Sequence, residues 1–416
     1  MSSASQRANT GKVHRIVKKI VNVTASAGLC FPTPETTQNA GTSTLRSSSS
    51  AIVDQITASI AASVGKKRDA GQPEGTPTPE LVYLSRLDEG ITRKQGKSGF
   101  LYYGPNGARI TDTGEVDRIA ALAIPPAYTE VLISPDPQTH LQAIGKDARG
   151  RKQYRYHPDW HAERGKAKFA LLPSFASRLP KVRERVDHDL RMRTPGMEKA
   201  LATIVWLLDH LFIRVGNTVY AEENGSYGLT TLKNRHVKVS GSSVHFQFKG
   251  KSGKEWRLSH SDRRITRIIR SLQELPGQQL FQYLDEDGDR HQIRSQDVNA
   301  YIREATGGEF SSRQFRTWGA TQMAATALST VEPAETERQR KRQINEAVDG
   351  IAAALVNTRA VCRSSYIHPK VFEDFENGEL QTLRAQRKSA SETMTRWMND
   401  DEIRVLRWLK KTTNSA

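Results

Sequence analysis

A series of apolar residues spaced three and four positions apart constrains the fold of this 416-residue chain more than any other feature. Its members are Leu201, Ile204, Val205, Leu208, Leu211, Phe212 and Val215. In a helix this spacing places every member on one face, so the sequence predicts a helix that packs into a helical core. Asp209 and His210 interrupt the series, and nowhere do apolar residues reach the ~18–20 needed to cross a bilayer. The sequence therefore predicts that the chain is not a membrane protein.

Short β-type segments lie before and after this helix. Residues 80–84, 100–103 and 129–133 have strand composition and lie beside Gly- and Pro-containing turns, and residues 236–258 have the pattern of a hairpin. A second series, at Ile344, Val348, Ile351 and Leu355, again predicts a helix. We expect an α+β fold with a small β-rich N-terminal domain at 81–165. A mainly α domain at 166–416, with a small inserted sheet, would follow it.

Residues 1–80 differ in composition from the rest of the chain. They are rich in Ser, Thr, Gly and Pro and poor in aromatic residues. Such a segment buries too little apolar surface to offset its ordering entropy, so the sequence predicts a disordered tail. Its nine basic and five acidic residues give +4 of the total charge of +17. Most of the positive charge therefore belongs to the folded part, where it favours nucleic acid as partner.

Several other classes of protein are disfavoured by missing motifs. Two cysteines, Cys30 and Cys362, are too few for a disulfide framework or a Cys-rich zinc site, which favours a reducing cytoplasm. The Gly-Lys-Ser sequences at 96–98 and 250–252 lack the earlier glycine that a phosphate-binding loop requires. The pair His157 and His161 lacks the glutamate of the zinc-protease motif. We expect no nucleotide, metal or other cofactor.

Five residues have side chains suited to metal-free phosphodiester chemistry. We expect Arg214 to end the apolar helix; Lys251 lies in a Gly-flanked hairpin turn, and Arg316 lies between aromatic residues. Asn357 and Tyr366 lie nine positions apart around a short helix. Guanidinium groups bind phosphate oxygens with forked donors, tyrosine can attack phosphorus, and lysine can protonate a leaving oxygen.

Taken singly, each residue has an ordinary structural interpretation. Arg214 could complement a helix C-terminus, Asn357 could cap the helix that follows it, and Lys251 could be a solvated turn residue. Arg316 could stack on its aromatic neighbours, and Tyr366 could be a half-buried core residue. The functional interpretation depends on all five together, in this order.

In their wider context these residues resemble a known family. Eight segments carry the resemblance, in order: Ile124-Pro-Pro-Ala-Tyr128, His140-Leu-Gln-Ala143, Gly150-Arg-Lys-Gln-Tyr-Arg-Tyr-His157, Phe212-Ile-Arg-Val-Gly-Asn217, Tyr227-Gly-Leu-Thr-Thr-Leu-Lys-Asn-Arg-His236, Phe248-Lys-Gly-Lys-Ser-Gly253, Phe315-Arg-Thr-Trp318, and Val356-Asn357 with Tyr366. From about residue 81 to about residue 380 the chain resembles the bacterial, poxvirus-like branch of the type IB DNA topoisomerases. That resemblance implies a catalytic domain of the tyrosine recombinase/type IB topoisomerase kind.

The resemblance implies a role for each of the five residues. Tyr366 matches the nucleophile that forms a 3′-phosphotyrosyl intermediate, which is later resealed without ATP or metal. Arg214 and Arg316 match the arginines that hold the scissile phosphate, and Lys251 matches the general acid, with Arg214 assisting. Asn357 occupies the position of a histidine in the viral relatives, and it would donate a hydrogen bond without titrating near neutral pH.

The resemblance also covers positions that contact DNA, and the sequence departs from the family at two positions. Gln153, Tyr154 and Tyr156 match positions that touch DNA, and we expect Tyr220 and Arg313 to do so as well. Arg313 replaces a lysine common in the family, and Gln314 stands where many relatives have an acidic residue. The implied protein is a monomer that clamps duplex DNA in the cytoplasm, associated with the nucleoid.

Two other functions are compatible with part of this pattern. A tyrosine recombinase shares the Arg-Lys-Arg-Tyr set, but its usual histidine three positions before the second arginine is Arg313 here. A non-catalytic basic DNA-binding protein would need only the charge and the aromatic residues. The nearly complete catalytic set and the N-terminal motifs favour the topoisomerase.

Overall fold

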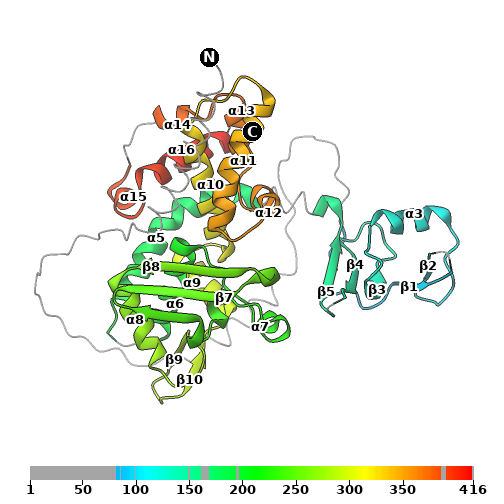
Figure 1. The fold of residues 1–416 in the computed structure, drawn as a ribbon, viewed down its shortest axis with the longest axis horizontal. Helices are drawn as coiled ribbons and strands as arrows, with labels where there is room; N and C mark the ends of the chain where they lie inside the picture. Colours follow the sequence, from blue (N-terminus) through cyan, green and yellow to red (C-terminus); the bar gives the residue numbers. More distant parts are fainter. Residues whose placement is uncertain are drawn as a thin grey trace, which may run out of the picture. The chain divides into compact units, whose positions relative to one another are not determined.

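The computed structural model describes residues 81–414 except 85, 98, 149, 161–167, 194–195 and 386–389. The described residues up to 160 form one compact unit, and those from 168 onward belong to the other (Figure 1). The predicted tail at 1–80 lies outside the described residues. The predicted domain boundary at 165/166 falls within the undescribed segment 161–167, so it too stays a prediction. Within the described part, no helix combines the length and apolar character needed to span a membrane.

The N-terminal unit contains a five-stranded antiparallel sheet with the strand order β2-β1-β3-β4-β5. The strands are β1 (Ile91–Gln95), β2 (Phe100–Tyr103), β3 (Thr129–Ile133), β4 (Leu141–Lys146) and β5 (Lys152–Tyr156). The strands predicted at 100–103 and 129–133 are confirmed. The strand predicted at 80–84 is wrong, because among its described residues only Val82 forms a bridge, to Thr139, and the neighbouring Tyr83 is exposed.

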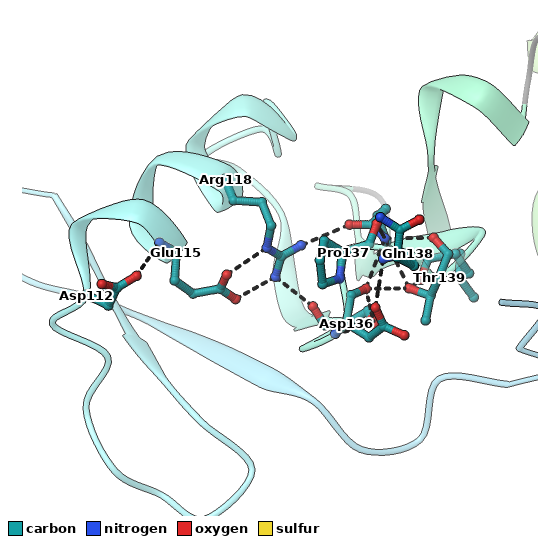
Figure 2. A network of polar contacts seen from close by, with 10 residues as sticks. Asp112, Glu115, Arg118, Asp136, Pro137, Gln138 and Thr139 are labelled. Atoms are coloured by element: carbon teal, nitrogen blue, oxygen red, sulfur yellow. Dashed lines mark hydrogen bonds and ion pairs between the residues drawn. The ribbon is translucent and has the colours of Figure 1, made fainter. Parts of the chain in front are cut away.

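One helix of this unit, α3 (Thr113–Ala121), is fastened to the sheet by an arginine. Asp112 caps the helix by accepting a hydrogen bond from the backbone N–H of Glu115. Arg118 pairs with Glu115 and also donates to the Gln142 side chain at 2.9 Å and the Ser134 carbonyl at 2.8 Å (Figure 2). Because its guanidinium is satisfied on several sides, Arg118 fixes the helix against the end of β3 and the start of β4.

The second unit is mainly helical and is built around α10 (Arg313–Ser329), whose residues from Phe315 to Ser329 are all buried. The other helices of this unit include α5 (Leu172–Leu190), α6 (Met197–Leu211), α9 (Ser295–Thr306), α11 (Glu337–Ala354), α12 (Arg359–Ser365), α13 (Lys370–Glu376), α14 (Thr382–Ala385), α15 (Glu392–Trp397) and α16 (Asp400–Asn414) (Figure 1). The helices predicted from the two apolar series correspond to α6 and α11.

The apolar series continues past the end of its helix. Helix α6 ends at Leu211, because Phe212 adopts a left-handed conformation with φ 54°. The prediction that Arg214 ends this helix is therefore wrong: Arg214 lies in the non-helical segment that follows. The turn at Phe212 brings its ring against Gly319 of α10, where a Cβ atom would overlap the ring. A helical periodicity cannot reveal such a turn, because the residues after it remain buried for a different reason.

The predicted hairpin at 236–258 is confirmed and gains a third strand. The antiparallel strands β6 (Val237–Ser240), β7 (Ser243–Lys249) and β8 (Glu255–Ser261) pair in that order, and α8 (Arg263–Gln273) follows them. A single 3-10 turn at Lys251–Gly253 joins β7 to β8. The sequence does not predict the small hairpin of β9 (Gln282–Leu284) and β10 (Arg290–Gln292), because its strands are too short to show a periodicity.

The C-terminal helices belong to the core of this unit. Leu406, Trp408 and Leu409 of α16 are buried. Trp408 donates a hydrogen bond to Asp374 of α13 at 2.7 Å. The C-terminal helix α16 therefore supports α13, the helix that follows Tyr366.

Candidate active site

Arg214 is held by a close approach of two backbone segments. Its carbonyl accepts a hydrogen bond from the Leu229 N–H at 2.9 Å. The segments approach closely at Gly216 and Gly228, and a Cβ on Gly228 would lie 2.5 Å from the Gly216 Cα atom. Gly216 also has φ +100°, a conformation that side chains other than glycine's rarely allow. The two glycines therefore fix the backbone from which Arg214 projects.

Arg316 is a buried cation that ties three elements together. On α10, it is only 2% exposed. Its Nη2 donates to the Leu355 carbonyl at the end of α11 at 2.9 Å, and its Nη1 donates to the Phe212 carbonyl after α6. Burial, with the nearby charge of Arg214, lowers the pKa of Arg316 to about 10. The side chain thus stays positively charged at neutral pH in an environment that disfavours that charge.

Asn357 lies beside Arg214 just after α11. Its Oδ1 accepts a hydrogen bond from Arg214 Nη2 at 2.6 Å. Helix α12 is capped by Thr358, whose side chain accepts from the Val361 N–H, so the alternative that Asn357 caps this helix is wrong. The Asn357 Nδ2 and the Arg316 Nε are buried and have no hydrogen-bond partner among the described residues. Buried donors are nearly always satisfied in folded proteins, so two unpartnered donors at one site are suited to binding an acceptor such as a phosphate oxygen.

Tyr366 follows α12 directly and is 9% exposed. The Arg316 guanidinium carbon lies 4.9 Å from the centre of its ring. Burial alone would raise the pKa of the Tyr366 phenol. The charges of Arg316 and Arg214, with hydrogen bonds from both, outweigh burial and lower that pKa below the usual value for tyrosine. The phenolate form of Tyr366 is therefore easier to reach than that of an ordinary tyrosine.

The backbone around Tyr366 is fixed by a buried threonine of α10. Thr321 Oγ1 donates to the Tyr366 carbonyl at 3.2 Å and accepts from the His368 N–H at 3.1 Å. Thr321 lies five residues after Arg316, so the helix that carries the arginine also positions the tyrosine. Sequence reasoning missed Thr321, because one threonine in a buried helix has no distinguishing pattern.

Lys251 is not joined to the other four residues. It is exposed in the turn between β7 and β8, and within the described part of the chain no hydrogen bond or ion pair links it to them. The base of its hairpin is nevertheless tied to the Arg214 region, because the Tyr227 N–H donates to the Lys249 carbonyl at 2.8 Å. The structure thus assembles Arg214, Arg316, Asn357 and Tyr366, and it places Lys251 on an adjoining exposed hairpin.

The residues predicted to touch DNA are distributed over both units. Tyr154 and Tyr156 lie on one face of β5, both exposed, with ring centres 6.2 Å apart. Gln153 lies on the opposite face of that strand, where it donates to Asp147 at 3.0 Å. In the second unit, Tyr220 is exposed on α7 (Thr218–Asn224), and Arg313 is exposed at the start of α10.

The departure at Gln314 has a local structural role. Its side-chain oxygen accepts hydrogen bonds from the backbone N–H and the hydroxyl of Ser311, at 3.0 and 2.9 Å. It therefore closes the first turn of α10, the helix that carries Arg316. An uncharged amide oxygen can accept both of these hydrogen bonds, so a carboxylate is not required here.

Comparison with known proteins places this site in a family. A family model described as the catalytic core of eukaryotic DNA topoisomerase I matches residues 157–394, and one described as the N-terminal domain of bacterial DNA topoisomerase IB matches residues 99–147. The chain belongs to the type IB DNA topoisomerases, isomerases that act on duplex DNA. This membership sets aside the recombinase and the non-catalytic alternatives.

Viral enzymes are among the individual relatives of this chain. The DNA topoisomerase 1B of Acanthamoeba polyphaga mimivirus is 35% identical over 300 residues, which cover 70% of this chain and 89% of the relative. The DNA topoisomerase I of monkeypox virus is 26% identical over 141 residues, which cover 33% of this chain and 44% of the relative. The bacterial N-terminal match and the viral relatives together confirm the bacterial, poxvirus-like type predicted from the motifs.

Proposed function

We propose that Tyr366 is the nucleophile with which this type IB topoisomerase cleaves one DNA strand. The observation that carries this assignment is that Arg316 and Arg214 both act on Tyr366, while Asn357 is hydrogen-bonded to Arg214. Arg316 and Asn357 each retain a buried N–H donor that has no partner among the described residues. A phosphate bound there would accept these donors, and the two guanidinium groups would offset its charge and stabilise the transition state.

In the proposed reaction the Tyr366 phenol loses its proton to solvent and its oxygen attacks the scissile phosphorus. The bond from phosphorus to the 5′ oxygen breaks, and a 3′-phosphotyrosyl bond forms. Lys251 donates a proton to the departing 5′ oxygen, which leaves a 5′-hydroxyl end. Resealing reverses these steps, with the hydroxyl attacking the phosphotyrosine. The phosphoester bond is exchanged and not hydrolysed, so the cycle needs no external energy source.

The remaining features of the proposal concern DNA binding and architecture. Tyr154, Tyr156, Tyr220 and Arg313 would contact the duplex through exposed side chains, and Gln153 would act from the other face of β5. We propose a monomer in which an N-terminal domain at 81–165 and a catalytic domain at 166–416, of the tyrosine recombinase kind, clamp the duplex. Its site of action would be nucleoid DNA in the cytoplasm.

A covalent-trapping experiment tests the assignment of the nucleophile. The full chain is incubated with a short duplex in which the fragment carrying the 5′-hydroxyl end dissociates after cleavage, so that the strand cannot be resealed. The denatured adduct is then mapped by proteolysis and mass spectrometry. The expected result is a DNA 3′ end attached to Tyr366. The variant Tyr366→Phe should bind the duplex with unchanged affinity and form no adduct. An adduct at another residue, or relaxation of plasmid by Tyr366→Phe, would refute the proposal.

A further inference from the structure

A lysine that the motifs do not include contacts the segment that carries Tyr366. Lys168 lies in a short helical stretch just before α5. Its Nζ donates a hydrogen bond at 2.9 Å to the carbonyl of Ser365, which is 197 positions away in sequence and immediately precedes Tyr366. Ser365 is the last residue of α12. Carbonyls at the end of a helix lack intrahelical partners, and a cation there also interacts favourably with the helix dipole.

The next residue, Phe169, holds the other side of the same segment. Its ring packs edge-on against the ring of His368, with centres 5.2 Å apart. The Lys168 ammonium in turn lies 4.0 Å from the centre of the Phe169 ring. Residues 168 and 169 therefore contact the chain one position before and two positions after Tyr366.

The charges around Lys168 are unusual for a structural lysine. No carboxylate of the described residues pairs with it; the charged or titratable groups that act on it are Arg313, Tyr366 and His368. Burial, with the repulsion of Arg313, lowers the pKa of Lys168 to about 8, although Tyr366 opposes this shift. A half-buried ammonium with no carboxylate partner among the described residues is costly, so its retention beside Tyr366 suggests a use for its charge.

We propose that Lys168 is a positioning residue for the nucleophile. It fixes the end of α12 through the Ser365 carbonyl, so that the Tyr366 phenol stays beside Arg316, and its positive charge adds to the field that favours the phenolate. This inference rests on the proposed role of Tyr366. It differs from a direct DNA contact, because the effect of Lys168 passes through the tyrosine and not through the phosphate backbone.

Single-turnover cleavage by the full chain at saturating DNA tests the inference. Lys168→Met keeps the length of the side chain and removes its charge and its donor. We expect the cleavage rate constant to fall about 10- to 100-fold, since a misplaced reacting group costs on this order. The affinity for DNA should stay within about twofold, and Lys168→Arg should restore most of the rate. The matched control is Lys341→Met, at an exposed lysine of α11, which should leave the rate unchanged.

A second substrate separates a role in attack from a role in proton donation. A duplex with sulfur in place of the 5′ bridging oxygen has a leaving group that needs no protonation. On this substrate Lys251→Ala should regain a rate close to that of the unaltered chain, whereas Lys168→Met should stay slow. Recovery of Lys168→Met on the sulfur substrate would overturn the inference.

Two further outcomes would also overturn it. One such outcome is that Lys168→Met cleaves normally at saturating DNA but binds DNA more weakly, and that the slope of log affinity against log salt concentration decreases by about one. Lys168 would then be a contact to a DNA phosphate. If the rate is unchanged in every respect, the contact to Ser365 is incidental. If thermal unfolding shows that Lys168→Met does not fold, the same measurements are made on Lys168→Gln. In each case adduct formation at Tyr366 in the unaltered chain shows whether the proposed function itself still stands.

Discussion

The side-chain oxygen of Asn357 accepts a hydrogen bond from Arg214 at 2.6 Å, across 143 residues of sequence. Because its oxygen is occupied in this way, the amide presents its Nδ2 donors to the other side. That nitrogen is buried and has no partner among the described residues. Arg214 therefore orients the amide as well as contributing its own charge. Because the two side chains are hydrogen-bonded, a substitution of either one should also disturb the position of the other.

Replacing Asn357 by aspartate separates the two functions of this amide. Asn357→Asp keeps an acceptor for Arg214 but removes the free donor and adds a negative charge. We expect the cleavage rate to fall about 10²- to 10³-fold, as when one donor to a developing anion is lost. Asn357→His keeps a donor, so its cleavage rate should fall less than that of Asn357→Asp. That rate should also change with pH near the histidine pKa of about 6.5. Single-turnover cleavage between about pH 5.5 and 9 measures both, and an aspartate variant of normal rate would contradict the prediction.

Gly319 connects packing to the position of Arg316. A methyl group at this position would overlap the ring of Phe212, whose carbonyl accepts a hydrogen bond from Arg316. We expect Gly319→Ala to lower the free energy of unfolding by about 1–3 kcal/mol, as overpacked cores do, and to slow cleavage. Urea denaturation and single-turnover cleavage measure these effects. At the control position Gly196, the nearest atom to an added methyl is 3.6 Å away, on Glu198, so Gly196→Ala should cost less and leave cleavage intact.

A buried arginine holds the C-terminal helices to the catalytic core. Arg183 of α5 binds Asp209 of α6 and Glu402 of α16, each at 2.7 Å, and donates to the Trp397 carbonyl at 2.6 Å. Arg183→Met would leave two buried carboxylates without their cation. We expect a loss of about 3–5 kcal/mol in the free energy of unfolding.

Denaturant unfolding of two matched variants checks this expectation. The comparison is Arg342→Met on α11, which removes the exposed partner of Glu346 and should cost less than about 1 kcal/mol. Similar costs for the two variants would show that the Arg183 network contributes no more than a surface ion pair.

The sequence predicted those features that repeat or that follow a local pattern. The apolar face of α6, the hairpin around Lys251 and the strands at 100–103 and 129–133 belong to this group, because each depends on residues close together in the chain. The features that were missed depend on tertiary contacts. The turn at Phe212 exists because Gly319 makes room for its ring, and no periodicity encodes that distant glycine.

The candidate site follows the same division. The five candidate residues could be selected from the family motifs, but the groups that hold them in place could not. Arg316 donates to two carbonyls, and any residue type could supply a carbonyl, so this contact leaves no trace in the sequence. The same holds for Lys168, whose partner is also a carbonyl. Backbone acceptors are invisible to motif analysis, and here they hold much of the site in place.

His368, two residues after Tyr366, should make the stability of the catalytic unit depend on pH. Its Nδ1 accepts a hydrogen bond from the Lys370 N–H at 3.2 Å, which requires an unprotonated nitrogen. Burial, together with the charges of Lys370 and Lys168, lowers the pKa of His368 to about 4, although Asp374 opposes the shift. In the unfolded chain a histidine has a pKa of about 6.5, so between these values the unfolded state binds more protons.

The contribution of His368 to the free energy of unfolding should therefore be fully present above about pH 6.5, and it should decrease as the pH falls toward 4. For a shift of this size, the contribution of His368 to the loss between pH 7 and 5 is about 2 kcal/mol. Urea denaturation at both pH values measures it. His368→Gln removes the titrating group and should reduce the difference by about this amount, whereas His245→Gln, at an exposed position on β7, should leave it unchanged. An equal pH dependence in His368→Gln and the unaltered chain would show that His368 is not the group that resists protonation in the folded state.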